Sequence, residues 1–117
     1  MIIHCMKRTE WEAVKDEESF GFESIERCGF VHCCEVRYLW RVLPNFEDDE
    51  DERVLLCLDE DRIGSPIVYE DDGGYGRTYP HVYGPIKTGA VIQVLDYLKD
   101  EEGHYRKNGE FASIRDE

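Results

Sequence analysis

The sequence predicts an α+β fold with a mainly antiparallel sheet. Helix-type patterns come early in the chain and strand-type runs dominate from residue 53 onward, which favours segregated helices and strands. With 117 residues, the chain is long enough for one domain with its own core and too short for two. We therefore predict a single domain over residues 1–100, followed by a polar C-terminal tail over residues 101–117 to which we assign no structure.

The first predicted elements are a strand and a helix. The apolar run MIIHCM, residues 1–6, predicts a short strand. In the following stretch, Thr9 and Glu12 form the T-x-x-E capping pattern of a helix start. Trp11 and Val14 would then form the inner stripe of that helix.

The next elements are a turn, a strand and a second helix. FGFESIE, residues 20–26, is interpreted as turn-like, and CGFVHCC, residues 28–34, as a strand. The run EVRYLWRVL, residues 35–43, has apolar side chains at i, i+3, i+4 and i+7, which predicts a helix that Pro44 ends. Its inner face would consist of Val36, Leu39, Trp40 and Leu43. We expect Trp40 to be a core residue, as Trp11 is.

Strands dominate the second half. The acidic segment EDDEDE, residues 47–52, is interpreted as a solvated loop, because like charges resist packing. The glycine-rich segment 71–78 is interpreted as a flexible hairpin, in which Arg77 is the candidate contact for an anion. The predicted strands lie within residues 53–59, 66–71, 79–86 and 90–98.

Composition excludes several classes of partner. The formal net charge of −13 repels phosphate backbones, and Lys and Arg form no stripe, so we predict no nucleic acid partner. No run approaches the roughly 18 apolar residues that span a bilayer, so we predict no membrane partner. The five cysteines are an odd number and lie mostly inside apolar runs, which indicates reduced thiols and a cytoplasmic protein.

Three of the four histidines, His4, His32 and His81, interrupt strand-like apolar runs, and this is the clearest functional signal in the sequence. Alternation along a strand places Phe30 beside His32 on one face. A buried imidazole needs hydrogen-bond partners or costs on the order of 1–3 kcal/mol, so three such residues together favour a site over three separate core positions.

The same alternation places Tyr83 on the face of His81, and Glu70 beside Val68. If these faces converge, imidazoles, a carboxylate and aromatic rings line one cleft. Apolar and aromatic walls with a few polar groups are typical of small-molecule sites, so we predict a small-molecule ligand.

The motifs SIERCGFVHCC, RVLLCLD, IVYED and YPHVYGPI, in this order after the strand with His4, resemble bacterial domain-of-unknown-function family 952. The resemblance runs from Ile2 to about Leu98, and its most specific phrases are GF-apolar-HC and PH-apolar-YGP. That family is similar in fold to ADP-ribosyltransferases, in which two small sheets split to hold NAD. The resemblance therefore implies an ADP-ribosyltransferase-like fold with a split antiparallel sheet and two early helices, and NAD as a possible substrate.

The resemblance also implies residue roles. It assigns catalysis to Glu70, which would steady an oxocarbenium ion or orient the acceptor, and to His32. The residues that it implies for NAD binding are His4, His81, Tyr83, Phe30 and Ser24. The chain departs from the family at Cys34, where the family usually has serine, so a hydroxyl is missing.

Whether the protein is an enzyme therefore stays open at this point, and three alternatives compete with ADP-ribosyl transfer. The first is a binding module of the same fold that does not turn over its ligand. The second is a metal site in which His32 and Cys34 are joined by Cys28, His4 and His81. The third is a Cys33 nucleophile, although strand neighbours such as His32 face away from it. We predict no metal ligand.

Overall fold

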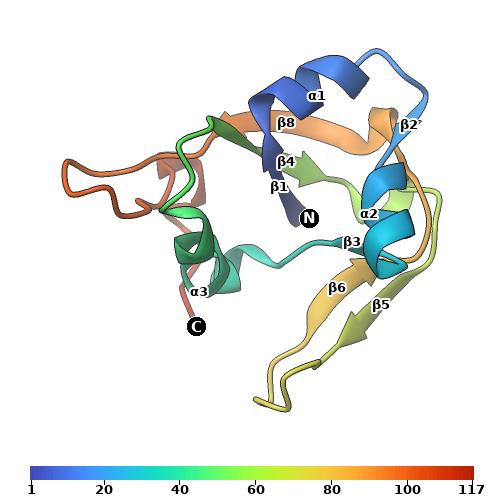
Figure 1. Cartoon of the computed structure of the whole chain (residues 1–117). Coiled ribbons are helices and arrows are strands. Elements are labelled where there is room, and N and C mark those ends of the chain that lie inside the picture. The colour runs from blue at the N-terminus through green and yellow to red at the C-terminus, as the bar shows by residue number, and fades with distance from the viewer.

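The computed structural model describes all residues, 1–117, and has an α+β fold in which every strand pair is antiparallel (Figure 1). The strands form one sheet in the order β1-β4-β8, a two-stranded sheet β2-β7, and a third sheet in the order β3-β6-β5. The strands are β1 Ile2–Lys7, β2 Ser19–Phe20, β3 Val31–His32, β4 Arg53–Leu58, β5 Ile67–Glu70, β6 Tyr79–Val82, β7 Ile86–Lys87 and β8 Val91–Asp96. The prediction of an α+β fold with antiparallel strands is confirmed.

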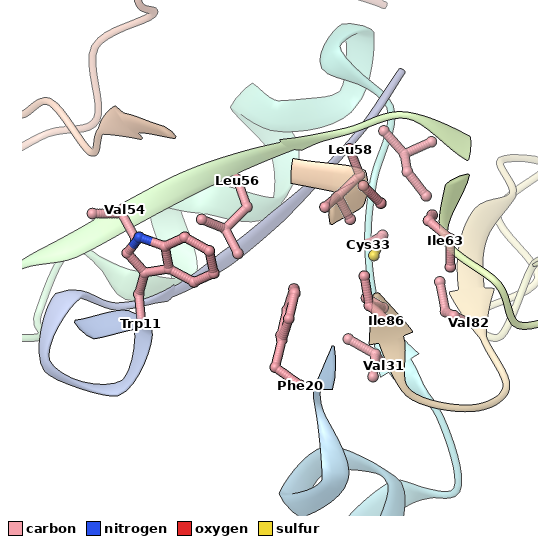
Figure 2. Close-up of a cluster of buried hydrophobic side chains, with 12 residues drawn as sticks. Trp11, Phe20, Val31, Cys33, Val54, Leu56, Leu58, Ile63, Val82 and Ile86 are labelled. Atoms are coloured by element: carbon pink, nitrogen blue, oxygen red, sulfur yellow. The ribbon is translucent and has the colours of Figure 1, made fainter. Parts of the chain in front are cut away.

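Strand β4 lies between β1 and β8 and is the most deeply buried element. Its residues 54–58 have no solvent exposure. A strand covered on both faces needs apolar side chains at consecutive positions, which the run VLLCL supplies. In Figure 2, Val54, Leu56 and Leu58 of this strand lie along one face.

The core has two parts, one on each face of the β1-β4-β8 sheet. Alternation along β4 sends Val54, Leu56 and Leu58 into the first part, where Trp11 and Phe20 join them (Figure 2). The neighbouring residues of β4 enter the second part, which consists of Ile3, Cys34, Val36, Leu39, Leu43, Leu55, Cys57, Leu95 and Phe111. Both parts therefore depend on the register of one central strand.

Helix α1, Arg8–Val14, follows β1 without a loop, and this corrects the predicted capping pattern. Its N-cap residue is Lys7, and no side chain caps the helix, so Thr9 and Glu12 already lie inside it. The apolar stripe is as predicted, since Trp11 is buried in the core.

Helix α2, Phe22–Cys28, occupies the segment that the sequence analysis interpreted as a turn, so that interpretation is wrong. None of its residues is buried, which explains why no apolar periodicity indicated it. Gly21 and Gly29 bound the helix with φ of 99° and 87°, a left-handed conformation that glycine adopts without strain. None of the helices in the structure has the length and apolar character needed to cross a membrane.

The second predicted helix is broken into three short pieces. A 3₁₀ turn at Val36–Tyr38 leads into α3, Leu39–Val42, and a second 3₁₀ turn follows at Leu43–Phe46. Each change of helix type shifts the angular phase, so the strict i, i+3, i+4, i+7 face does not persist. Trp40 is consequently 44% exposed, contrary to the prediction of a core residue.

Residues 101–117 are polar in composition, but they pack back onto the domain. Phe111 is 2% exposed and belongs to the second part of the core. Asn108 is also buried, and its Nδ2 donates a hydrogen bond to the Asp96 carbonyl oxygen at 2.9 Å. One aromatic side chain in a polar stretch is too weak a sequence signal for such docking, so the sequence analysis left this segment without structure.

The acidic segment 47–52 makes ion pairs and hydrogen bonds with the rest of the domain, so it is more than the solvated loop that the sequence predicted. Arg53 pairs with Asp49 at 2.6 Å, and Lys7 pairs with Asp51 at 2.9 Å. A Glu47 carboxylate oxygen accepts a hydrogen bond from the Tyr105 backbone N–H at 2.8 Å. The segment thereby ties the C-terminal residues to the rest of the domain.

The buried position of Phe111 makes a direct stability prediction. Phe111→Ala should lower the free energy of unfolding by about 3–5 kcal/mol, because it leaves a cavity in the core. Phe22→Ala, at a side chain that is 59% exposed, is the matched control and should change it by only about 0.5 kcal/mol. Urea unfolding followed by circular dichroism measures both. Equal effects would show that the C-terminal segment does not contribute to the core.

Candidate functional site

A cavity of about 1160 Å³ lies between β1, α1, α2, the segment after β3, and α3. Small-molecule sites commonly occupy roughly 300–1,000 Å³, so this space accommodates a ligand of the size of a dinucleotide. About half of its lining is hydrophobic, and the lining residues that matter for its chemistry are His4, Phe20, Ser24, Arg27, His32 and Arg53.

His4 presents a hydrogen-bond acceptor to this cavity. Its Nδ1 lies 2.7 Å from the His32 carbonyl oxygen. A carbonyl oxygen only accepts, so Nδ1 carries the hydrogen and Nε2 carries the lone pair. Burial lowers the pKa of His4 below 6.5, which keeps the ring neutral near pH 7. No protein group bonds to Nε2, so this atom is available to a donor on a ligand.

Strand β3 pairs with β6 so that Val31 faces Val82 and His32 faces His81. Val31 and Val82 point into the core, with no solvent exposure. The two imidazole rings therefore lie on the outer face of this sheet, with centroids 5.3 Å apart and nearly perpendicular planes.

The outer face of the β3-β6-β5 sheet carries a compact cluster around His81. The Phe30 ring stacks on the imidazole of His81 at 4.0 Å and lies 5.3 Å from the Tyr83 ring. His81 Nδ1 lies 2.9 Å from a Glu70 carboxylate oxygen, and the Tyr83 hydroxyl donates to the same oxygen. The hydrogen bond from Tyr83, followed by that from His81, lowers the pKa of Glu70, which is therefore ionised.

The sequence-predicted residues fall into two groups that meet at His32. His4 and Ser24 line the cavity together with His32, and Ser24 reaches it from the unpredicted helix α2. The other four, Phe30, Glu70, His81 and Tyr83, belong to the outer cluster and do not line the cavity. The predicted imidazoles, carboxylate and aromatic rings therefore lie on two connected surfaces, whereas the sequence predicted that they line one cleft.

The sequence analysis did not identify several residues of the candidate site, including Phe20, Arg27 and Arg53 of the cavity and Asp72 of the outer cluster. Arg53 reaches the cavity from the first position of β4, where its guanidinium lies 4.3 Å from the centre of the Phe46 ring. Asp72 approaches His81 from the segment after β5, with 3.5 Å between a carboxylate oxygen and Nε2. A charge at a strand end and an aspartate in an acidic turn look like ordinary surface residues, so no sequence signal distinguished them.

The cysteines do not assemble a reactive or metal-binding centre. All five are free thiols, and burial raises the pKa of Cys33 and Cys34, that of Cys34 to about 12. Thiols at such pKa values are poor nucleophiles at neutral pH. Only one group of three or more His, Cys, Asp or Glu side chains places its ligand atoms close together, namely Glu70, Asp72 and His81, and it contains no cysteine.

Comparison with known sequences defines the class of protein. Residues 5–94 match a family described as "Protein of unknown function (DUF952)". The match covers most of the chain, and this protein belongs to that family. The family resemblance inferred from the sequence motifs is thereby confirmed. A search of curated proteins finds no match.

Two solved structures of protein CC0527 from Caulobacter crescentus share the fold. The crystal structure is 24% identical in sequence, covers 90% of this chain and 92% of CC0527, and has a TM-score of 0.69. The solution NMR structure is 23% identical, covers 97% of each chain, and has a TM-score of 0.76. At such identities the likeness is one of fold alone.

The neutral state of His4 predicts a pH dependence of stability. Because its pKa is lower in the folded than in the unfolded chain, the unfolded chain binds more protons between the two values. Stability therefore falls as pH drops below about 6.5. His4→Asn keeps a donor for the His32 carbonyl oxygen but does not titrate, so it should lose less stability than the wild type between about pH 7.5 and about pH 5. Urea unfolding at several pH values tests this, and equal losses would contradict a buried, neutral His4.

Proposed function

We propose that the cavity binds NAD or ADP-ribose. The observation that carries the proposal is the free Nε2 acceptor of His4, held in place by the His32 carbonyl oxygen inside a cavity of dinucleotide size. A ribose hydroxyl is a donor that complements this acceptor. The ADP-ribosyltransferase-like fold that the sequence resemblance implies would suit the same ligand class.

Other cavity residues fit the remaining parts of such a ligand. Phe20 and Phe22 supply aromatic surface for a base. Arg27 on α2 lines the cavity and pairs with Glu23 only loosely, at 3.5 Å on an exposed surface, so its guanidinium can turn to a phosphate. Arg53 is held by Asp49, which compensates its charge, so we assign the phosphate contact to Arg27.

The ligand class is consistent with the compartment that we propose. NAD and ADP-ribose are intracellular metabolites, and five free cysteines suit the reducing cytoplasm. The excess of acidic residues does not oppose binding of a small anion when an arginine lines the site, because solvent screens distant charges at physiological salt.

Calorimetric titration with NAD, ADP-ribose and a nucleotide panel tests the binding proposal. We expect saturable binding of NAD or ADP-ribose by the wild type. His4→Asn removes the Nε2 acceptor and should weaken binding by about tenfold, the usual value of one hydrogen bond. His104→Asn, at an exposed histidine outside the cavity, is the matched control and should bind like the wild type. No binding of any nucleotide, or equal binding by both variants, would refute the proposal.

Cleavage of NAD is a second candidate function, which one observation favours. Glu70 is ionised and held by Tyr83 and His81, and the His81 ring contacts that of His32, which lines the cavity. A carboxylate near the reacting ribose could stabilise a developing oxocarbenium ion. The first candidate, binding without turnover, is favoured by the position of Glu70 outside the cavity lining.

Glu70→Gln separates the two candidates. The change keeps the shape but removes the charge, so in an enzyme it should abolish nicotinamide release while NAD affinity stays within about threefold of the wild type. In a binding module the wild type itself releases no nicotinamide. Chromatographic measurement of nicotinamide, with affinity from calorimetry, decides between them. Undiminished release by the variant would remove Glu70 from the catalytic apparatus.

A further inference from the structure

The His81 ring is flanked by a carboxylate at each nitrogen. Nδ1 lies 2.9 Å from a Glu70 oxygen, and Nε2 lies 3.5 Å from an Asp72 oxygen. The side chain of His81 is only 4% exposed, whereas that of Asp72 is 65% exposed. A nearly buried imidazole thus faces the solvent through a carboxylate that lies just beyond hydrogen-bonding contact.

The two nitrogens are not equivalent. His81 Nδ1 lies 2.9 Å from a Glu70 carboxylate oxygen, which acts as the acceptor, so Nδ1 carries a hydrogen. In the neutral ring, Nε2 then carries a lone pair that points toward the Asp72 carboxylate. In this arrangement Nε2 and the carboxylate oxygen are two acceptors that face each other, and a proton or a metal ion between them would relieve the repulsion.

The separation of these acceptors matches a metal bridge. A tetrahedral ion with metal–nitrogen and metal–oxygen distances of about 2.0–2.2 Å holds its ligand atoms roughly 3.3–3.5 Å apart. The observed 3.5 Å from Nε2 to the Asp72 oxygen has this value. The ligand atoms of Glu70, Asp72 and His81 all lie within 4.8 Å of one another.

We propose that His81 Nε2 and Asp72 bind a divalent transition metal ion, of which Zn²⁺ is the representative. Glu70 accepts the Nδ1 hydrogen of His81 and thereby fixes the tautomer, as carboxylates commonly do for metal-bound histidines. Imidazole and carboxylate donors together suit Zn²⁺ and its first-row neighbours, whereas Mg²⁺ prefers oxygen ligands and water.

His32 is the nearest further imidazole, although its ring nitrogens are not among the ligand atoms that lie within 4.8 Å of one another. No protein group hydrogen-bonds to its ring, and the ring centroid is 5.3 Å from that of His81. Two imidazoles on one tetrahedral ion have centroids roughly 5 Å apart, from the same bond lengths. The direct pairing of His32 with His81 across β3 and β6 brings the two rings to this spacing without any change in the backbone.

The residues around the proposed metal site fix its geometry and leave it accessible to solvent. Phe30 stacks on the His81 ring and fixes its plane. In the segment that follows β5, the Asp71 side chain accepts hydrogen bonds from the backbone N–H groups of Tyr75 at 3.0 Å and Gly76 at 2.7 Å. This turn holds the chain beside Asp72, whose exposed carboxylate gives an ion direct access from solvent.

The proposal goes beyond nucleotide binding and can fail independently of it. Asp72, His81 and Glu70 do not line the cavity, so zinc binding requires no nucleotide. Loss of NAD binding in His4→Asn would leave the metal site untouched. Conversely, absence of zinc binding would leave the cavity proposal as it stands.

Calorimetric titration of the metal-free protein with Zn²⁺, in parallel with Mg²⁺, tests the site. We expect one Zn²⁺ per chain and no saturable binding of Mg²⁺. Asp72→Asn removes a ligand at an exposed side chain, which keeps the fold intact, and should weaken Zn²⁺ binding at least about 100-fold. Glu70→Gln should weaken it about 10–100-fold. Asp16→Asn removes one exposed carboxylate without a hydrogen-bond partner and should bind like the wild type.

Cobalt substitution and one further variant make the test decisive. Co²⁺ bound by imidazole and carboxylate should give visible absorption bands that Asp72→Asn abolishes. His104 has two neighbouring carboxylates and is the competing surface site, so His104→Asn should leave Zn²⁺ affinity unchanged. Absence of Zn²⁺ binding, equal affinity in wild type and Asp72→Asn, or loss of binding in His104→Asn would each overturn the proposal.

Discussion

The short segment Val31–Cys34 holds the two larger sheets together, and the arrangement of both polar surfaces depends on it. Val31 and His32 pair with β6, and the Cys33 N–H still donates to the Pro80 carbonyl oxygen at 3.1 Å. At the next residue the chain changes partner, because Cys34 and Ile3 exchange two backbone hydrogen bonds at 2.8 and 2.9 Å. Since Cys33 and Cys34 are buried in opposite parts of the core, the segment has little freedom to shift.

The strands could be predicted from the sequence because a buried strand needs a local pattern. Val54–Leu58 is an uninterrupted apolar run, and Ile67–Glu70 and Tyr79–Val82 are short runs rich in β-branched and aromatic residues between turn segments. Helix α2 could not be predicted, since no residue of it is buried and its ends depend on glycine conformation. The packing of Phe111 into the core could not be predicted either, because a single long-range contact produces no periodicity in the sequence.

The candidate site, like the fold, could be predicted from the sequence only in part. Shared faces follow from alternation, so the grouping of Phe30, His32 and His81 was accessible from sequence. The separation of the cavity from the outer cluster was not, because it depends on where β3 crosses from one sheet to the other. Arg53 and Asp72 reach their positions only through tertiary packing, and their local sequence resembles that of any charged surface.

His32 connects the two surfaces through different atoms, and this has an energetic consequence. Its carbonyl oxygen fixes the tautomer of His4 in the cavity, while its ring lies edge-on to His81 on the outer face. Because the ring also lines the cavity, a ligand that moves it changes the surroundings of His81. If the proposed ligand and the proposed ion both act on this ring, thermodynamic linkage requires that each changes the affinity of the other by the same factor. Such a coupling would pass through one side chain on a two-residue strand and would require no movement of the sheets.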